Sequence, residues 1–272
     1  MIGNISKMNV ALAEPVEYSL PVGDERVALN RHIGGNLRIG YQGEINCVSC
    51  GRKTSKSYAQ GHCYPCFISL AECDMCILKP ETCHFAAGTC REPEWAQAHC
   101  MQPHYVYLAN SSGIKVGITR GSQIPTRWID QGASQALPIF RVGTRYQSGL
   151  LEVVIKNHIS DRTDWRKMLR GDPEPVDLEG LRDELADRCE AEIERLRHDF
   201  GEGVIEFLPA EAVVDIHYPV VEYPHKIRSF NLLKQTNIEG TLLGIKGQYL
   251  ILDTGVLNVR NHSGYKIDVH LN

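Results

Sequence analysis

The spacing of apolar and polar residues predicts an ordered set of strands and helices in the middle of the chain. Apolar side chains recur at every second position in residues 105–109 and 114–119, which is typical of two strands, and the Asn-Ser-Ser-Gly run between them favours a turn. We expect a helix around residues 125–131, a strand over 137–142 and a helix over 149–159. Together these elements make a β-β-α-β-α module.

The segments on either side of this module are expected to hold further strands and one long acidic helix. Residues 36–41 roughly alternate between apolar and polar positions, and neighbouring glycines favour turns. Residues 177–200 have the pattern of one helix, and glycines divide residues 237–270 into the short strands of a small β-barrel or sheet. The helix has an incomplete apolar stripe made of Leu178, Leu181, Leu185, Ile193 and Leu196.

These patterns predict an α+β fold with five parts. They are an N-terminal β region (1–46), a cysteine-rich zinc-binding region (47–104), the β-β-α-β-α module (105–170), an acidic helical segment (171–215) and a C-terminal β domain (216–272).

Composition agrees with a soluble protein. The chain has 272 residues, of which 43% are hydrophobic and 23% are charged, as in ordinary globular proteins. No run of residues approaches the ~20 apolar positions of a membrane-spanning helix. The first residues lack the basic-then-apolar pattern of a secretory signal, so we expect a cytoplasmic protein that has no membrane partner.

The cysteines indicate metal binding. Nine of the ten lie between Cys47 and Cys100, and clustered cysteines in a reducing compartment bind metal more often than they form disulfides. Two Cys-x2-Cys pairs are separated by twelve residues, and each such turn places two thiolates on one side of an ion. We therefore expect a structural zinc site formed by Cys47, Cys50, Cys63 and Cys66.

A second group of candidate ligands follows the first. A second zinc ion is the leading interpretation, an iron–sulfur cluster is an alternative, and some of these cysteines could simply pack in the interior. Because residues 47–104 have little apolar pattern, bound metal is expected to supply part of their folding free energy. The group consists of Cys73, Cys76, Cys83, Cys90, Cys100 and His104.

Charge is distributed unevenly, although the net charge is only −4. Residues 105–170 hold ten Lys or Arg and four Asp or Glu, whereas residues 171–215 hold four Arg and fifteen Asp or Glu. The basic module is suited to a polyanion, and the acidic helix is expected to dock on it or to attract a protein partner.

One face of the predicted strand pair carries the residues on which a family resemblance rests. Strand alternation places Tyr105 and Tyr107 on one face, and Lys115 and Gly117 on the polar face of the partner strand. The runs Tyr-Val-Tyr and Lys-Val-Gly-Ile-Thr, followed by Arg127, resemble the GIY-YIG nuclease superfamily. They look most like its phage-derived branch, in which the second signature reads Lys-Ile-Gly-x-Thr. The similarity covers residues 105–159, and the whole chain also resembles an uncharacterised bacterial domain-of-unknown-function family with a cysteine-rich front end.

The GIY-YIG resemblance implies a phosphodiester hydrolase that depends on a divalent metal ion. Glu152 would match the family's metal-binding glutamate and hold Mg²⁺ or Mn²⁺. Arg127 would stabilise charge on the phosphoryl oxygens. Tyr107, with Tyr105 beside it and Lys115 assisting, would orient or deprotonate the nucleophile. Lys115 itself stands where the plain second signature has a tyrosine.

The same residues also have plain structural interpretations. Glu152 could pair with Lys156 one helical turn later. The two tyrosines could be ordinary strand aromatics, and the arginines could be solvated surface charges.

Three functions from different classes remain open at this level. The first is a zinc-stabilised nuclease acting on DNA or RNA, and the second is a non-catalytic nucleic-acid-binding adaptor on the same fold. The third is a metal- or redox-responsive protein that uses the Cys73–Cys100 cluster. Contacts to DNA or RNA are expected from Arg120, Arg141, Arg145, Lys246 and Tyr249.

Overall fold

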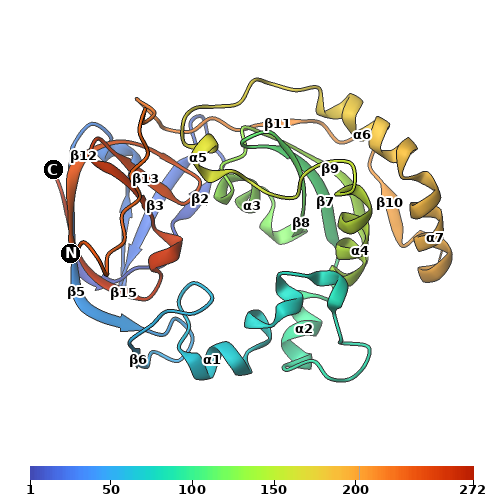
Figure 1. The fold of residues 1–272 in the computed structure, drawn as a ribbon, viewed down its shortest axis with the longest axis horizontal. Coiled ribbons are helices and arrows are strands. Elements are labelled where there is room, and N and C mark those ends of the chain that lie inside the picture. Colours follow the sequence, from blue (N-terminus) through green and yellow to red (C-terminus); the bar gives the residue numbers. More distant parts are fainter. Residues whose placement is uncertain (202) are drawn as a thin grey trace.

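Three antiparallel sheets, joined by a cysteine-rich segment, organise the chain in the computed structural model, which describes residues 1–201 and 203–272. Figure 1 shows the largest sheet on one side, the central module on the other, and the cysteine-rich segment passing beneath both.

The largest sheet is built from both ends of the chain. Its strand order is β1-β15-β5-β12-β13-β14, with β6 added to β5. The long strand β5 pairs with β12 on one side and with β15 on the other. The sheet is formed by β1 (Ile2–Asn4), β5 (Asn36–Asn46), β6 (Lys53–Thr54), β12 (Asn237–Lys246), β13 (Tyr249–Leu252), β14 (Gly255–Asn258) and β15 (Tyr265–Leu271).

This pairing joins the segments 1–46 and 216–272 into one structural unit. The N-terminal ammonium of Met1 donates a hydrogen bond to the carbonyl of Val269 at 2.9 Å. Among the residues that the structure describes, the edge strands β1 and β14 are not paired with each other. The C-terminal strands therefore belong to an open sheet, and of the two expected forms, barrel or sheet, the sheet is observed.

A small second sheet packs on the first. It contains β2 (Asn9–Ala11), β3 (Glu17–Val22) and β4 (Glu25–Ala28) in that order. Burial alternates along β3, where Tyr18, Leu20 and Val22 face the interior. They share a core with Leu37 and Ile39 of the largest sheet, so the predicted N-terminal β region has its hydrophobic partner at the C-terminus of the chain.

The central module contains the predicted elements in the predicted order. Its sheet has the order β10-β9-β7-β8, with β11 also paired to β9. The strands are β7 (His104–Asn110), β8 (Ile114–Arg120), β9 (Gln135–Val142), β10 (Ile205–Phe207) and β11 (Val214–Asp215), and the helices are α3 (Thr126–Asp130) and α4 (Arg145–Ile155). The helix α4 begins earlier than expected because Thr144 and Gln147 form a capping box at its N-terminus.

The two faces of the module sheet belong to different cores. Val106, Leu108 and Val116 pack with α4 and the acidic helices. Tyr107 and Ala109, on the opposite face, share the core of the largest sheet. The module is thus attached to the rest of the molecule through the sheet face that carries Tyr107 and Lys115.

The acidic segment forms two helices, and the prediction of one continuous helix was wrong. The helices are α6 (Leu178–Arg188) and α7 (Glu190–Phe200), and they meet at Cys189. Leu185, Cys189 and Ile193 are four positions apart, a spacing that a continuous helix would also place on one face, so the apolar pattern itself does not indicate the break. Leu178, Leu185 and Ile193 are buried in the core of the module sheet, and Cys189 is itself fully buried at the junction of the two helices.

The cysteine-rich segment has little regular structure. It contains α1 (Tyr64–Ser69) and α2 (Pro93–His99), together with the single-turn 3₁₀ helices η2 (Ala71–Cys73), η3 (Met75–Ile77) and η4 (Pro80–Thr82). The remaining short helices are η1 (Asn30–His32), η5 (Gly121–Gln123), α5 (Trp165–Met168) and η6 (Arg260–His262). None of the helices that the structure describes combines the length and apolarity needed to cross a bilayer.

Candidate metal centres and a candidate catalytic face

The first group of cysteines forms a tetrahedral cage. Cys47 follows β5 directly, and Cys63 precedes α1, whose first turn contains Cys66. The sulfur atoms of all four cysteines lie within 4.8 Å of one another, and those of Cys50 and Cys63 are 3.7 Å apart. Zinc–sulfur bonds of about 2.3 Å in a tetrahedron place the sulfur atoms about 3.8 Å apart. The cage therefore fits a zinc ion.

Backbone amides prepare this cage for a cation. Burial alone would raise the pKa of Cys47, but hydrogen bonds from the amides of Cys50, Cys63 and Ser49 lower it to about 6. A thiol with such a pKa is ionised at neutral pH, which is the form that binds metal. The expected ligand set Cys47, Cys50, Cys63 and Cys66 is brought together as the sequence predicted.

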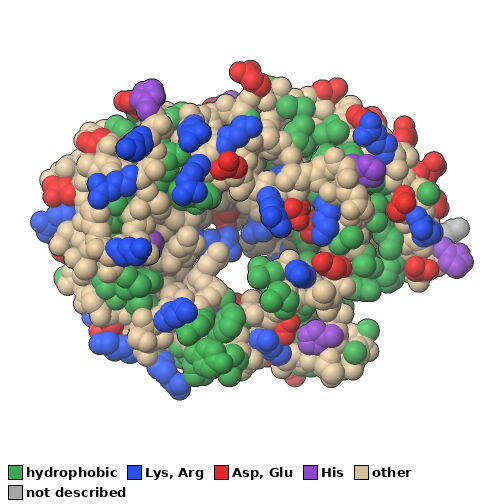
Figure 2. Space-filling model, viewed as in Figure 1, with side chains coloured by type: hydrophobic (Ala, Val, Ile, Leu, Met, Phe, Trp, Pro, Cys, Tyr) green, Lys and Arg blue, Asp and Glu red, His purple; other side chains and the backbone are tan. Residues whose placement is uncertain are grey.

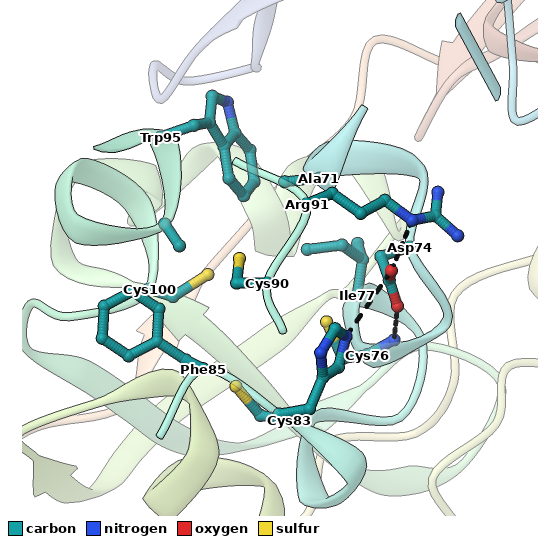
Figure 3. Close-up of a pocket in the computed structure, with 12 residues that line it drawn as sticks. Ala71, Asp74, Cys76, Ile77, Cys83, Phe85, Cys90, Arg91, Trp95 and Cys100 are labelled. Carbon is teal, nitrogen blue, oxygen red and sulfur yellow. Dashed lines mark hydrogen bonds and ion pairs between the residues drawn. The ribbon is translucent and has the colours of Figure 1, made fainter. Parts of the chain in front are cut away.

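The second group of cysteines is only partly brought together. Cys76, Cys83, Cys90 and Cys100 line one pocket, shown in Figure 3, and Cys73 is not among its lining residues. His104 is fully buried in β7, where its Nδ1 atom is 2.7 Å from the carbonyl oxygen of Gln102. Burial lowers the pKa of His104 to about 4, so this imidazole is neutral at physiological pH.

Four of the five predicted catalytic residues lie close enough together for the charges of some to change the pKa values of the others. Tyr107 comes from β7, Lys115 from β8, Arg127 from α3 and Glu152 from α4. The charges of Arg127 and Glu152 both influence the pKa of Tyr107 and of Lys115. The residues are thus clustered, although they are distributed over almost 50 positions of the chain.

The centre of this face is a glutamine that sequence reasoning missed. The Oε1 atom of Gln131 accepts hydrogen bonds from the Tyr107 hydroxyl at 2.9 Å and from the Lys115 ammonium at 2.5 Å. Gly117 lies directly opposite Tyr107 in the strand register, and a Cβ atom there would be 2.7 Å from the phenol oxygen. The glycine of the second signature is therefore required to make space for the phenol.

Two groups of this face have pKa values moved towards neutrality. Burial, followed by the charge of Arg127, lowers the pKa of Lys115 to about 7. Burial, followed by the charge of Asp161, raises the pKa of Glu152 to about 7. Perturbed pairs of this kind are concentrated at functional sites. Glu152 is half-buried. The charge of Lys156, the expected pairing partner, lowers the pKa of Glu152, but burial and the charge of Asp161 outweigh it.

Tyr105 lies apart from this cluster. It lines a hollow of about 400 Å³ together with Gly121, Pro125 and Trp128. The pKa of Arg141 is raised mainly by the hydrogen bond from its guanidinium to Glu206, and Tyr105 makes the next largest contribution.

The predicted nucleic-acid contacts have different environments. Arg120 is half-exposed at the end of β8. Arg141 is exposed and paired with Glu206 at 3.1 Å. Arg145 turns towards the cysteine-rich segment, where its Nη2 atom donates to the carbonyl of Ile77 at 2.6 Å.

The two predicted contacts of the C-terminal segment are held inside the molecule. Lys246 is completely buried and pairs with Asp172 at 2.6 Å. It therefore contributes nothing to an exposed nucleic-acid-binding surface, contrary to expectation, because the side chain needs that carboxylate to offset its burial. Tyr249 is half-buried and stacks on Trp165 with a centroid distance of 5.6 Å.

A second arginine near Arg127 also escaped the sequence analysis. Burial and the charge of Arg127 lower the pKa of Arg260, which lies in η6, the connection between β14 and β15 of the largest sheet. Asp130 acts on Arg260 in the opposite direction, but its carboxylate is already engaged by Lys7 at 2.9 Å and Gln248 at 2.8 Å. No local pattern could have revealed this proximity, because the two arginines come from distant parts of the chain.

Comparison with known proteins identifies the family. Residues 34–267 match the family model described as "Protein of unknown function (DUF2797)". The chain belongs to this family. The DUF2797 match covers the cysteine-rich segment, the central module and most of the largest sheet, which confirms the expected membership in a family of unknown function. No curated protein and no solved structure matches the chain. The similarity to GIY-YIG nucleases therefore stays a prediction.

Proposed function

We propose that this protein is a metal-assisted phosphodiesterase that acts on nucleic acid, with the site formed by Tyr107, Lys115, Arg127 and Glu152. The observation that carries the proposal is that Tyr107 and Lys115 both donate to Gln131, while the charges of Arg127 and Glu152 act on both of these side chains. An arginine, a carboxylate, an amine with a pKa near 7 and a phenol are the groups that phosphodiester hydrolysis needs.

The carboxylate oxygens of Glu152 are the groups on this face suited to Mg²⁺ or Mn²⁺. The charge of Asp161 acts on Glu152 and supplies a second carboxylate to the surroundings. Such an ion, when bound, neutralises phosphate charge and activates water.

The remaining side chains have roles that follow from their contacts. The Nζ atom of Lys115 is about half deprotonated at pH 7, so it can accept a proton from the attacking water. Arg127 lies beside the Tyr107 phenol and lowers its pKa against the effect of burial, and its guanidinium is the group suited to the phosphoryl oxygens. Tyr107 fixes Gln131, and Gln131 in turn holds Lys115 in place.

A nucleic acid is the substrate class that the surrounding charge favours. Lys and Arg side chains border the central opening of the molecule in Figure 2. Arg127 and Arg260 approach each other from opposite sides of the interface between the module and the largest sheet. The charge of Arg127 lowers the pKa of Arg260. An anion between two like charges stabilises both of them, and a phosphodiester backbone supplies such anions.

A binding protein without turnover is the second candidate, and one observation favours it. Tyr107 is 0% exposed and Lys115 is 3% exposed. Water reaches their polar atoms only if the surrounding side chains move. An adaptor that retains the face for phosphate contact would need no such movement.

Cleavage assays test the proposal. Purified protein is incubated with single-stranded DNA, double-stranded DNA and structured RNA, with Mg²⁺, with Mn²⁺ and with chelator. We expect cleavage that depends on the divalent ion and that falls at least about 100-fold in Glu152→Gln and Arg127→Gln, as for loss of one electrostatic catalytic group.

Glu179→Gln and Arg195→Gln are the matched controls, because both side chains are exposed on the acidic helices. Cleavage that survives in Glu152→Gln would refute the assigned site. Salt-sensitive binding with no cleavage under any condition would establish the adaptor instead, since phosphate contacts release counterions.

A further inference from the structure

The segment from residue 71 to residue 100 has too small a core to hold its own conformation. Its regular structure is limited to α2 and three single-turn 3₁₀ helices. Within this fully described stretch, the buried residues are Ala71, Pro80, Ala96 and Cys100. Segments of this kind need a covalent or metal cross-link to be stable.

Four thiols of this segment converge on one pocket. Cys76 lies in η3, Cys83 follows η4, Cys90 lies in the loop before α2, and Cys100 ends α2. Figure 3 shows their sulfur atoms around a common space whose other walls are largely apolar, with Ile77, Phe85 and Trp95 among them. Cys100 is buried and the other three are half-buried, so none of the four is an exposed surface nucleophile.

The spacing of these thiols differs from that of the zinc cage in two ways. Their sulfur atoms do not form a group that lies within 4.8 Å of one another, as those of Cys47, Cys50, Cys63 and Cys66 do. They also contain no Cys-x2-Cys pair, since successive members are 7, 7 and 10 positions apart. Each thiol reaches the pocket singly and from a separate direction.

We propose that Cys76, Cys83, Cys90 and Cys100 bind a [4Fe–4S] cluster. Four cysteine thiolates are the ligand set of such a cluster, with one thiolate on each iron. A cluster of four irons and four sulfides is wider than a single ion, so it fits thiols that are farther apart than the zinc cage allows. The apolar walls keep water from the cluster, which is one of the ways in which proteins adjust its potential.

A smaller ligand set competes for one of these cysteines. The ligand atoms of Asp74, Cys76 and His84 lie within 4.8 Å of one another. The carboxylate of Asp74, however, is occupied by the guanidinium of Arg91 at 2.7 Å and by the amide of Cys76 at 3.2 Å. Asp74 also pairs with His84 at 3.6 Å, so both the carboxylate and the imidazole of this smaller set already have partners.

The cluster site is attached directly to α4. The backbone amide of Arg145 donates to the carbonyl of Cys100 at 2.8 Å, and its guanidinium donates to the carbonyl of Ile77 at 2.6 Å. A Cβ atom on Gly149 would be 2.5 Å from the Cβ atom of Pro80. The cysteine-rich segment thus holds the helix that carries Glu152, and the cluster acts as a structural support for that helix.

Metal analysis of the full chain tests the inference. The protein is purified without oxygen, and a second sample is reconstituted with ferrous iron and sulfide. We expect about four irons and four sulfides per chain, and about one zinc per chain. Cys76→Ser and Cys90→Ser should lose iron and sulfide but keep zinc, Cys50→Ser should do the reverse, and Cys73→Ser should keep both.

Three outcomes would overturn the inference. A second zinc in place of iron, lost in Cys76→Ser and His84→Ala but kept in Cys90→Ser, would assign the Asp74, Cys76 and His84 site. A second zinc lost in Cys90→Ser would show that the four thiols bind a single ion. Absence of any second metal from the wild-type chain would make these cysteines packing residues. The wild-type metal content decides the matter even if a variant fails to fold, and it is independent of nuclease activity.

Discussion

The buried ammonium of Lys115 leads to a quantitative prediction for the substitution Lys115→Met. The side chain is 3% exposed, and its only hydrogen-bond acceptor in the described part of the chain is Gln131 at 2.5 Å. Burial lowers its pKa from 10.5 to about 7. At about 1.4 kcal/mol for each pH unit, this difference costs the folded state about 4 kcal/mol at pH 7.

Methionine has a similar length and no charge, so it removes this cost and loses one hydrogen bond worth about 1 kcal/mol. We therefore expect Lys115→Met to raise the free energy of unfolding by about 3 kcal/mol at pH 7 while abolishing any catalytic activity. Because Lys115 destabilises the fold, we infer that this lysine is present for its function.

The pH dependence provides the sign of the effect. Between pH 7 and pH 10.5 the unfolded chain binds a proton at this lysine and the folded chain does not, so the stability of the wild type rises with pH. The advantage of Lys115→Met should accordingly shrink to about 1 kcal/mol at pH 9.

Urea denaturation of wild type and Lys115→Met at pH 7 and pH 9, with equal free zinc, measures these differences. Lys156→Met is the matched control, because Lys156 is exposed at the C-terminal cap of α4, and a change within about 0.5 kcal/mol is expected for it. If Lys115→Met is less stable than wild type at both pH values, the reasoning is refuted. The hydrogen bond from Lys115 to Gln131 would then stabilise the fold by more than the burial of Lys115 destabilises it.

Three further predictions concern other parts of the molecule. Gly117→Ala should lower the free energy of unfolding by about 1–3 kcal/mol, because its methyl group collides with Tyr107; an unchanged urea midpoint would contradict this packing. Cys50→Ser, or a chelator, should remove zinc and increase hydrogen exchange in residues 47–70 while the β7–β9 pairing stays protected; equal exchange throughout would contradict a local role for the metal. Arg260→Gln should reduce the salt slope of nucleic-acid binding by about 1, and a slope equal to that of Arg195→Gln would exclude Arg260 from phosphate contact.

The module was predictable because its signals are local. Alternation in β7 and β8 reflects one face packed on α4 and another directed to Gln131, and both patterns are visible in consecutive residues. The zinc cage was predictable for the same reason, since two Cys-x2-Cys turns each supply half of a tetrahedron.

The acidic helices show where local patterns mislead. Helix propensity continues through Cys189, and the sequence contains no glycine or proline there to stop it. The chain nevertheless breaks at Cys189 into two helices, both packed in the core of the module sheet, so the break has no local signal in the sequence.

By itself the sequence determined the order of elements in the module, the first metal cage and the candidate catalytic residues Tyr107, Lys115, Arg127 and Glu152. Their chemistry and spacing are carried by short stretches of chain.

Only the tertiary structure decided which distant segments meet. It joined β5 to β12 and β15, selected four of the later cysteines for one pocket, buried Lys246 against Asp172, and brought Arg260 towards Arg127. These contacts depend on how the apolar faces of separate elements are buried together, and that free energy belongs to the whole chain and has no local pattern in the sequence.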